Sequence, residues 1–377
     1  MSAQRKPKGR PAGAAFFGIK PSRGRSRAND QLAIRGLGPD WSVTCAVPID
    51  TDVIDLAVQP EPSPFAVPDA RPLDRAKFRD PLITARGEPR AHVDLRRLDT
   101  LWINTGTLCN LACKTCYIES SPTNDALVYL SLAEVDAFLN EAERAGTREI
   151  GFTGGEPFMN RDMIAMLHSA LGRGFEVLVL TNAMRPMRRF EDALKAIRLQ
   201  HGDRLTLRVS LDHHTQAVHE GERGPGTWDK ALDGLGWLSG HGFRISVAGR
   251  GLAGESEDEA RAGYARLFAR LGIGLDAADR SRLVLFPEMD ATADVPEIST
   301  GCWNILDVSP DAMMCASSRM VVKRKGAARP VVAACTLLPY QDEFALGATL
   351  AEASGRVMLN HPHCARFCVL GGASCSG

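Results

Sequence analysis

Three cysteines stand close together in the segment Cys109-Asn110-Leu111-Ala112-Cys113-Lys114-Thr115-Cys116. Their spacing is C-x3-C-x2-C, and cysteine thiolates are the usual protein ligands of iron–sulfur clusters. Three thiolates from one loop can hold three irons of a cubane, while the fourth iron has no protein ligand nearby in the chain. An iron left open in this way can bind the amino and carboxylate groups of a small molecule. The segment therefore predicts a reactive 4Fe–4S cluster on Cys109, Cys113 and Cys116.

A second chemically informative segment is Thr153-Gly154-Gly155-Glu156-Pro157, which follows about forty residues later. Glycines permit close backbone approach and unusual dihedral angles, and proline fixes the exit from the turn. The Glu156 carboxylate can accept a charge-assisted hydrogen bond from a ligand ammonium group. We therefore expect Gly154, Gly155, Glu156 and Pro157 to bind a cofactor. Taken alone, the segment fits an ordinary turn between a strand and a helix equally well.

These residues need a scaffold, and the apolar pattern from Thr100 onward predicts one. Short apolar segments alternate with stretches of helical period, and Ser131/Glu134 and Ser256/Glu259 form capping boxes. Such alternation predicts a parallel sheet with helices outside it, either a barrel or an open doubly wound sheet. Ligands bind at the carboxyl ends of the strands in both, so both motifs lie at one edge. The expected strands are 101–103, 149–153, 177–180, 205–209, 243–248 and 283–286, and Asn160 and Thr227 are expected helix caps.

Four polar residues end or follow later strands and are candidates for the same edge. They are Ser210, Asp212, Arg250 and Glu288. We expect Asp212, Arg250 and Glu288 to face a substrate as catalytic residues, in a mouth of mixed charge that suits a peptide or a polar metabolite better than a lipid. The alternatives are a cap or loop role for Ser210 and Asp212 and a surface ion pair for Arg250.

The chain after residue 300 is rich in cysteine. The regular periodicity ends after Phe286, so an irregular metal-binding module is expected, with strand, turn and strand between Cys302 and Cys315. His361 and His363 are further candidate ligands, and plain buried cysteines are the alternative. The six cysteines are Cys302, Cys315, Cys335, Cys364, Cys368 and Cys375.

Composition limits the class of protein. Of 377 residues, 44% are hydrophobic and 24% charged, as in soluble globular proteins, and the net charge is +0. No charge excess favours nucleic acid or an anionic membrane, and no apolar run is long enough to span a bilayer. The N-terminus lacks the apolar segment of a secretory signal, so we expect a cytoplasmic protein without a disulfide framework. The expected domains are 1–95 (basic, Pro-rich, largely disordered or peripheral), 96–290 (core barrel) and 291–377 (Cys-rich module).

Together, the C-x3-C-x2-C segment and Gly154-Gly155-Glu156-Pro157 resemble the radical S-adenosylmethionine (radical SAM) superfamily. The resemblance covers about residues 98–377 and implies a partial (βα)6 TIM-type barrel. Members bind S-adenosylmethionine at the open iron, with the Gly-Gly-Glu-Pro segment against its amino group. One-electron reduction yields a 5′-deoxyadenosyl radical, which abstracts hydrogen from a substrate.

Later segments resemble the subgroup with C-terminal auxiliary clusters, called SPASM and twitch domains. The resemblance implies an auxiliary iron–sulfur cluster, a cofactor contact for Ser210 and a place near the substrate for Asp212. Two departures stand out: the C-x2-C pair of the full SPASM pattern is missing, and Thr115 occupies a position that is often aromatic, with Tyr117 following instead. The segments are Thr181-Asn182, Ser210-Leu211-Asp212, His219-Glu220, Arg223-Gly224 and Thr227-Trp228-Asp229.

The resemblance implies an enzyme that abstracts hydrogen from a peptide or a small polar metabolite and takes electrons from a reductant such as flavodoxin or ferredoxin. A maturase or cluster-delivery factor that acts on another protein is the alternative within the family. Outside the family, the alternative is a zinc-stabilised binding module, although zinc in a structural site requires four closing ligands.

Overall fold

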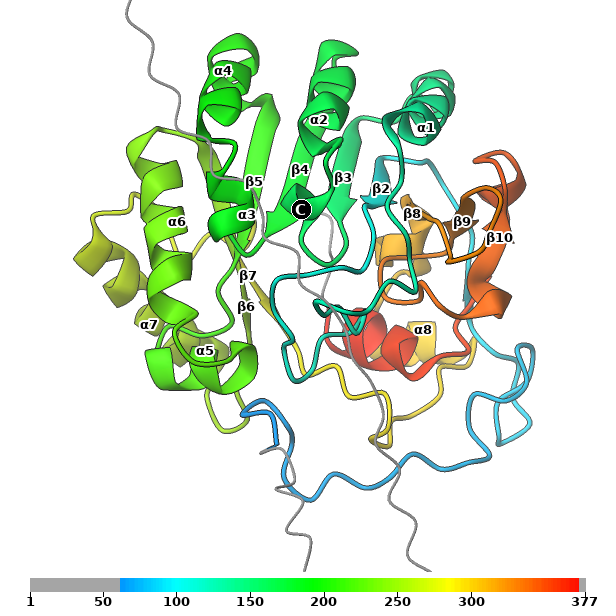
Figure 1. Cartoon of the computed structure of the whole chain (residues 1–377). Coiled ribbons are helices and arrows are strands. Elements are labelled where there is room, and N and C mark those ends of the chain that lie inside the picture. The colour runs from blue at the N-terminus through cyan, green and yellow to red at the C-terminus, as the bar shows by residue number, and fades with distance from the viewer. Residues whose placement is uncertain (1–61, 373–377) are drawn as a thin grey trace, which may run out of the picture. The chain divides into compact units, whose positions relative to one another are not determined.

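The computed structural model describes residues 62–372, which belong to one compact unit (Figure 1). Expectations for residues 1–61 and for Cys375 lie outside the described residues. Within them, one nine-stranded sheet has the order β10-β9-β8-β2-β3-β4-β5-β6-β7, and β1 and β11 form a separate pair.

Six parallel strands, β2 to β7, form the barrel part of the sheet. Each pairs with the next one along the chain, and the register of β2 with β3 runs from Thr100↔Glu149 to Asn104↔Thr153. The two ends of the sheet do not pair with each other, so the barrel is partial, as the family resemblance implied. The bounds are β2 Thr100–Asn104, β3 Glu149–Thr153, β4 Glu176–Thr181, β5 Leu205–Ser210, β6 Arg244–Arg250 and β7 Leu283–Phe286.

Helices connect these strands and cover the outer face of the sheet (Figure 1). Successive strand residues point to opposite faces. Leu101 and Ile103 therefore pack with the helices, whereas Trp102 packs with the C-terminal part of the chain. The helices are α1 Leu132–Ala145, α2 Met163–Gly172, α3 Arg185–Arg188, α4 Glu191–His201, α5 Gln216–Arg223, α6 Trp228–Gly240, α7 Glu257–Leu271 and α8 Cys302–Leu306.

Helix starts agree with the sequence at two of four expected caps. Ser131 and Ser256 form complete capping boxes with their glutamates. Asn160 does not cap α2, whose N-cap residue is Asp162, two positions later. The Asn160 side chain instead accepts from the Asp162 N–H and donates to the Leu130 carbonyl. Thr227 precedes α6, but its hydroxyl donates to the Gly224 carbonyl and caps nothing. Both polar side chains stabilise the preceding loop instead.

The sheet continues beyond the barrel with strands from the end of the chain. β8 (Ser318–Val322) pairs in parallel with β2, and β9 (Val331–Ala333) and β10 (Ala345–Gly347) follow antiparallel. The expected boundary at residue 290 remains a prediction, but the sheet runs across it.

The expected strand, turn and strand between Cys302 and Cys315 are wrong. This stretch contains α8, which is followed by its C-cap Asp307 with a φ of 52°, and then a 3-10 helix. Ser309 caps that helix and Pro310 occupies its first position, where proline is favoured. The short helices of the described chain are the 3-10 helices Pro157–Met159, Gly202–Arg204, Pro310–Ala312, Met314–Ala316, Asp342–Phe344 and Glu352–Ser354 and the π-helix Cys364–Leu370.

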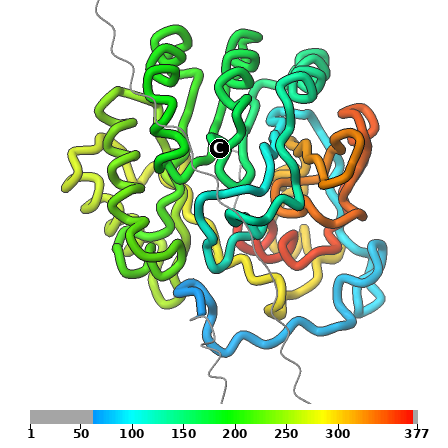
Figure 2. Tube along the Cα trace, viewed as in Figure 1, coloured from blue at the N-terminus to red at the C-terminus, as the bar shows by residue number. Residues whose placement is uncertain are grey.

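Residues 62–95 run along the later part of the chain, drawn in blue in Figure 2. β1 (His92–Val93) pairs with β11 (Val357–Met358), and Arg90 forms a buried ion pair with Glu297. Phe65, which lies in the same segment, is 1% exposed. These residues are therefore part of the packed unit, while the expected boundary at residue 95 stays a prediction.

None of the helices in residues 62–372 combines the length and the apolar character that crossing a membrane requires.

Candidate active site

A cavity opens at the carboxyl ends of the barrel strands, where the sequence places its candidate residues. The loops after β2, β3, β4 and β5 contribute to it, together with α5 and the ends of β6 and β7. Its lining includes Cys109, Cys113, Thr115, Cys116, Tyr117, Gly154, Gly155, Thr181, Asn182, Ser210, Asp212, Glu222, Arg223, Arg250, Phe286, Leu337 and Phe367.

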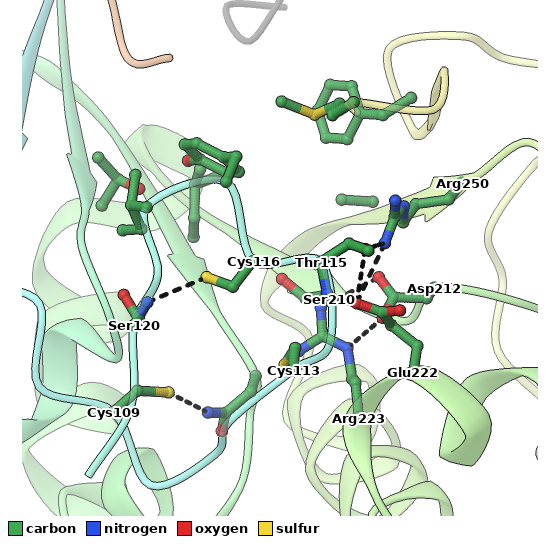
Figure 3. Close-up of a pocket in the computed structure, with 18 of the residues that line it drawn as sticks. Cys109, Cys113, Thr115, Cys116, Ser120, Ser210, Asp212, Glu222, Arg223 and Arg250 are labelled. Atoms are coloured by element: carbon green, nitrogen blue, oxygen red, sulfur yellow. Dashed lines mark hydrogen bonds and ion pairs between the residues drawn. The ribbon is translucent and has the colours of Figure 1, made fainter. Parts of the chain in front are cut away.

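The three clustered cysteines share this cavity, and Figure 3 shows their side chains turned toward a common space. Backbone N–H groups approach two of the sulfurs, from Leu111 to Cys109 and from Ser120 to Cys116, each at 3.4 Å. Burial raises the pKa of Cys109 to about 12 and that of Cys113 to about 11. The free thiols therefore keep their protons at neutral pH, and metal binding must release them.

The donor set fits a cluster better than a single zinc ion. Tetrahedral zinc at about 2.3 Å from each sulfur places two thiolates about 3.8 Å apart. Among the described residues, the one group of three His, Cys, Asp or Glu ligand atoms that all lie within 4.8 Å of one another contains no cysteine. A cubane spreads its thiolates over separate irons and thus farther apart.

Gly154 and Gly155 bring the turn after β3 against the cysteine loop. The Gly155 N–H donates to the Gly106 carbonyl at 2.8 Å, and the Glu156 N–H donates to the Leu108 carbonyl at 3.1 Å. A Cβ atom on Gly155 would overlap the Leu108 carbonyl, and Gly154 has a φ of +137°. Only glycine permits this approach, so the two motifs are joined through their backbones.

Glu156 lies beneath the cavity and does not line it. Its carboxylate accepts from the Thr181 hydroxyl at 2.9 Å, the Asn182 N–H at 2.8 Å and the Phe158 N–H at 3.2 Å. Burial raises its pKa to about 7, against the opposing effect of these hydrogen bonds. Pro157 begins the next 3-10 helix and is also absent from the wall. The backbone of Gly154 and Gly155, and not the Glu156 side chain, therefore forms this part of the cavity.

One ion pair in the cavity joins Asp212 and Arg223. The guanidinium donates to both carboxylate oxygens, at 2.6 and 3.1 Å (Figure 3). Burial alone would raise the pKa of Asp212, but the charge and hydrogen bonds of Arg223 outweigh it and hold this pKa below its usual value. The pair thus stays ionised in a site that water scarcely reaches.

A second ionic group centres on Arg250. Its guanidinium donates to the Thr115 hydroxyl at 2.5 Å and lies 3.2 Å from Glu222 and 3.1 Å from Glu288. Burial raises the pKa of Glu288, although Arg250 opposes this shift. The structure therefore brings Asp212 and Arg250 into the cavity wall and places Glu288 behind Arg250.

Sequence reasoning missed Glu222 and the part that Thr115 takes. Glu222 accepts from the N–H and the hydroxyl of Thr115, each at 2.8 Å, and so ties α5 to the cysteine loop. One signal was present: His219, Glu222 and Arg223 share one face of a helix at i, i+3 and i+4, which indicates a polar interior. The threonine that replaces an aromatic residue before Cys116 thus serves as a hydrogen-bonding centre.

The C-terminal cysteines are divided between two places. Cys315, Cys335, Cys364 and Cys368 line a second cavity together with His363, whose Nδ1 is buried without a hydrogen-bond partner in the described part of the chain. Cys302 is absent from that wall, and its sulfur lies 3.6 Å from the Ser299 hydroxyl. His361 is also absent from it, and its Nδ1 accepts from the His363 N–H. Burial raises the pKa of Cys364 to about 12.

Comparison with known proteins agrees with this geometry. The profile of the radical SAM superfamily matches residues 103–267. The chain is 26% identical over 140 residues to an AdoMet-dependent heme synthase of Oleidesulfovibrio alaskensis, covering 37% of this chain and 34% of the relative. It is 31% identical over 170 residues to the mycofactocin maturase MftC of Mycolicibacterium smegmatis, covering 44% and 41%.

A third relative is the antilisterial bacteriocin subtilosin biosynthesis protein AlbA of Bacillus subtilis, 29% identical over 141 residues, or 37% of this chain and 30% of the relative. The match spans about a third of the length of the first of these curated relatives. A solved structure of Streptococcus suis SuiB bound to the precursor peptide SuiA has a TM-score of 0.49 at 12% identity, covering 68% of this chain and 63% of that one.

The cysteine loop, the double-glycine turn and the barrel strands thus agree with the comparison: residues 103–267 match the radical SAM superfamily, and a mycofactocin maturase and a subtilosin biosynthesis protein are among the proteins that this part of the chain resembles.

Proposed function

We propose that this enzyme holds a 4Fe–4S cluster on Cys109, Cys113 and Cys116 and abstracts hydrogen from a polar substrate. The observation that carries the proposal is one shared cavity, in which three thiols face a glycine backbone wall and a buried guanidinium. When bound, the cluster supplies one electron that cleaves S-adenosylmethionine into methionine and a 5′-deoxyadenosyl radical.

The residues of this chain prepare the site for that cofactor. Gly154 and Gly155 expose backbone where side chains would block a close approach. Arg223 and Ser210 offer donors to a carboxylate, and Asp212 fixes the orientation of the guanidinium. Glu156 stabilises the turn from outside the cavity wall, because its carboxylate accepts hydrogen bonds from the N–H groups of Phe158 and Asn182. We thus assign Glu156 a positioning role, not the direct ammonium contact that its type suggests.

A peptide is the favoured substrate. Arg250, Glu222 and Asp212 give the wall charges of both signs, which suits the amide and charged groups of a peptide. The names of two relatives, a mycofactocin maturase and a subtilosin biosynthesis protein, also support a peptide. A small metabolite remains the second candidate, because another relative is the GTP 3′,8-cyclase of Rhodopirellula baltica, 31% identical over 182 residues.

We propose that the second cavity holds an auxiliary iron–sulfur cluster. Cys315, Cys335, Cys364 and Cys368 provide the four thiolates that a closed 4Fe–4S site needs. Leu337 lines both cavities, so the two sites adjoin. Such a cluster would supply an electron acceptor or a binding point beside the substrate. Cys302 is left out of this ligand set.

The test is iron content and cofactor cleavage in anaerobically reconstituted protein. Wild type should hold about eight irons, and replacement of Cys109, Cys113 and Cys116 by Ala should leave about four and abolish cleavage. Replacement of the four cavity cysteines should also leave about four irons but retain cleavage. Cys302→Ala is the matched control and should lose neither. Full cleavage in the first variant, or zinc without iron in wild type, would refute the proposal.

The substrate assignment is tested by separating cleavage from turnover. If a precursor peptide is encoded beside the gene, Arg250→Ala should reduce its turnover, while uncoupled cofactor cleavage continues. Arg280→Ala is the control, because this exposed arginine pairs with Glu257 on α7, away from the cavity wall. Normal peptide turnover by Arg250→Ala would place the substrate pocket elsewhere.

A further inference from the structure

A compact group of metal-ligand types lies beside the candidate active site and takes no part in the chemistry above. His213 and His214 follow Asp212 after β5, and Glu255 precedes α7. The Nε2 atoms of the two histidines lie 3.1 and 2.9 Å from the two oxygens of the Glu255 carboxylate. One ligand atom from each residue falls within 4.8 Å of the others. This is the group noted above as free of cysteine.

The two imidazole rings are held firmly in this orientation. His213 Nδ1 lies 2.8 Å from the Thr215 hydroxyl on the side away from Glu255. The His214 ring packs flat on α7 at Gly263, where a Cβ atom would overlap it. Tyr264 meets the edge of that ring and anchors its own hydroxyl on the Leu211 carbonyl at 2.6 Å. A held ring with a hydrogen-bonding partner on the far nitrogen, which His213 has in the Thr215 hydroxyl, is typical of histidine metal ligands.

We propose that His213, His214 and Glu255 bind one divalent transition-metal ion, Zn²⁺ in the first instance. Two imidazole nitrogens and one carboxylate oxygen make a ligand set that zinc accepts, with the fourth position open to water. The metal would lie between the two Nε2 atoms and the Glu255 carboxylate, in place of the protons that now join them. His213 then carries its proton on Nδ1 and donates it to the Thr215 hydroxyl, so the Thr215 N–H, which now donates to Nδ1 at 3.1 Å, turns to water instead.

All three ligand side chains are largely buried. His213 is 3% exposed, and the side chains of His214 and Glu255 are 13% and 17% exposed.

The ion would act as a clamp at the mouth of the barrel. It would join the segment after β5, which carries Asp212, to the segment after β6, which begins directly after Arg250. These two segments already meet through the Arg250 N–H and the Asp212 carbonyl at 2.9 Å. The site is independent of the iron chemistry, because none of its three ligands lines the cavity.

The experiment is a zinc titration of the cluster-loaded full chain under anaerobic conditions. Iron is loaded first so that the cysteines are occupied, and calorimetry then measures binding of ZnCl2. We expect about one zinc per chain without loss of iron. X-ray absorption spectra at the zinc edge should show nitrogen and oxygen scatterers at about 2.0 Å and no sulfur at about 2.3 Å.

Three variants complete the design. Glu255→Gln and His214→Gln should each weaken zinc binding more than about 100-fold, since removing even a supporting partner of a ligand costs 10–100-fold. His241→Gln is the control, because this exposed histidine bonds only the Trp237 carbonyl in the described structure and should bind zinc as wild type does. Zinc should raise the denaturation midpoint of wild type and of His241→Gln, and should leave that of Glu255→Gln and His214→Gln unchanged. Equal zinc affinity in wild type and both site variants, no binding by wild type, or sulfur ligation would overturn the proposal.

Discussion

At the scale of single residues, Glu156 shows how burial changes the part that a side chain takes. The same carboxylate that suits a ligand ammonium is 1% exposed and already accepts three hydrogen bonds from its own chain. Burial raises its pKa to about 7. Its protonation therefore couples to the stability of the fold.

We predict that Glu156 makes the stability of the cofactor-free, cluster-loaded protein fall between pH 4.5 and 7. The unfolded carboxyl group loses its proton near pH 4.5, while the folded one keeps it to about pH 7. The unfolded state thus binds fewer protons in this window, and stability falls by about 3 kcal/mol as pH rises through it and is level above it. Denaturation midpoints at pH 5 and pH 8 should show a larger drop for wild type than for Glu156→Gln. Glu176→Gln, at a carboxylate side chain that is 44% exposed, is the control, and parallel profiles for all three would contradict the coupling.

The cysteines and the double glycine could be predicted because their chemistry is carried by residue type and local spacing. Glu222 and Thr115 could not, because their parts depend on a meeting between α5 and the cysteine loop across more than a hundred residues. The local sequence also could not predict where the Glu156 carboxylate points. A carboxylate at a strand end can point into the cavity or below it, and the hydrogen-bond donors that decide this come from β4 and the loop after it.

At the scale of elements, the turn after β3 acts as the support of the cysteine loop. Two backbone hydrogen bonds join them, from Gly155 to Gly106 and from Glu156 to Leu108. The contact leaves no space for a side chain at position 155. The geometry of the three thiols therefore depends on a residue that has no functional group.

We predict that Gly155→Ala displaces the cysteine loop and loses iron from the first cluster. The added methyl group overlaps backbone, which cannot rotate away as a side chain can. Iron content and cofactor cleavage should both fall, while iron in the second cavity remains. The matched control is Gly236→Ala in α6, where a Cβ atom meets nothing within 4 Å. It should keep all iron and gain about 0.5–1 kcal/mol. Full iron and full cleavage in Gly155→Ala would show that the loop does not depend on the turn.

The barrel elements follow from local periodicity, and their bounds agree with the expected ones to within three residues. The strands after residue 315 could not be placed in this way, because β8 pairs with β2, which lies more than two hundred residues earlier. Short strands such as β9 and β10 carry too few residues to show a period. The cysteine-rich part was therefore expected to be a separate irregular module, whereas its strands extend the barrel sheet.

At the scale of the whole molecule, residues 62–66 tie the start of the described chain to the active-site wall. The Ser63 hydroxyl donates to Glu222 at 2.6 Å, and the Phe65 ring lies 4.4 Å from the Arg250 guanidinium. Both contacts end on the ionic group around Thr115. The segment thus closes the charged wall from outside.

We predict that a chain beginning at residue 67 is less stable than one beginning at residue 62. The shorter chain loses a hydrogen bond to a charged group and a desolvated cation–π contact, together worth about 2–4 kcal/mol. Thermal denaturation of the two cluster-loaded proteins measures the difference. Equal midpoints would mean that Ser63 and Phe65 follow the fold without stabilising it.

The pairing of β2 with β8 also means that the sheet cannot be completed until late in the synthesis of the chain. The cysteine loop follows β2 directly, yet β8 is translated roughly 200 residues later, which at 5–20 residues per second is about 10–40 s. During that interval the three cysteines of the growing chain have been synthesised, but β8, which pairs with one side of β2, has not. Contacts of such long range also slow folding once the chain is released. Iron delivery to this protein should therefore follow translation, and a cell that makes it must keep the waiting thiols reduced until the last strands arrive.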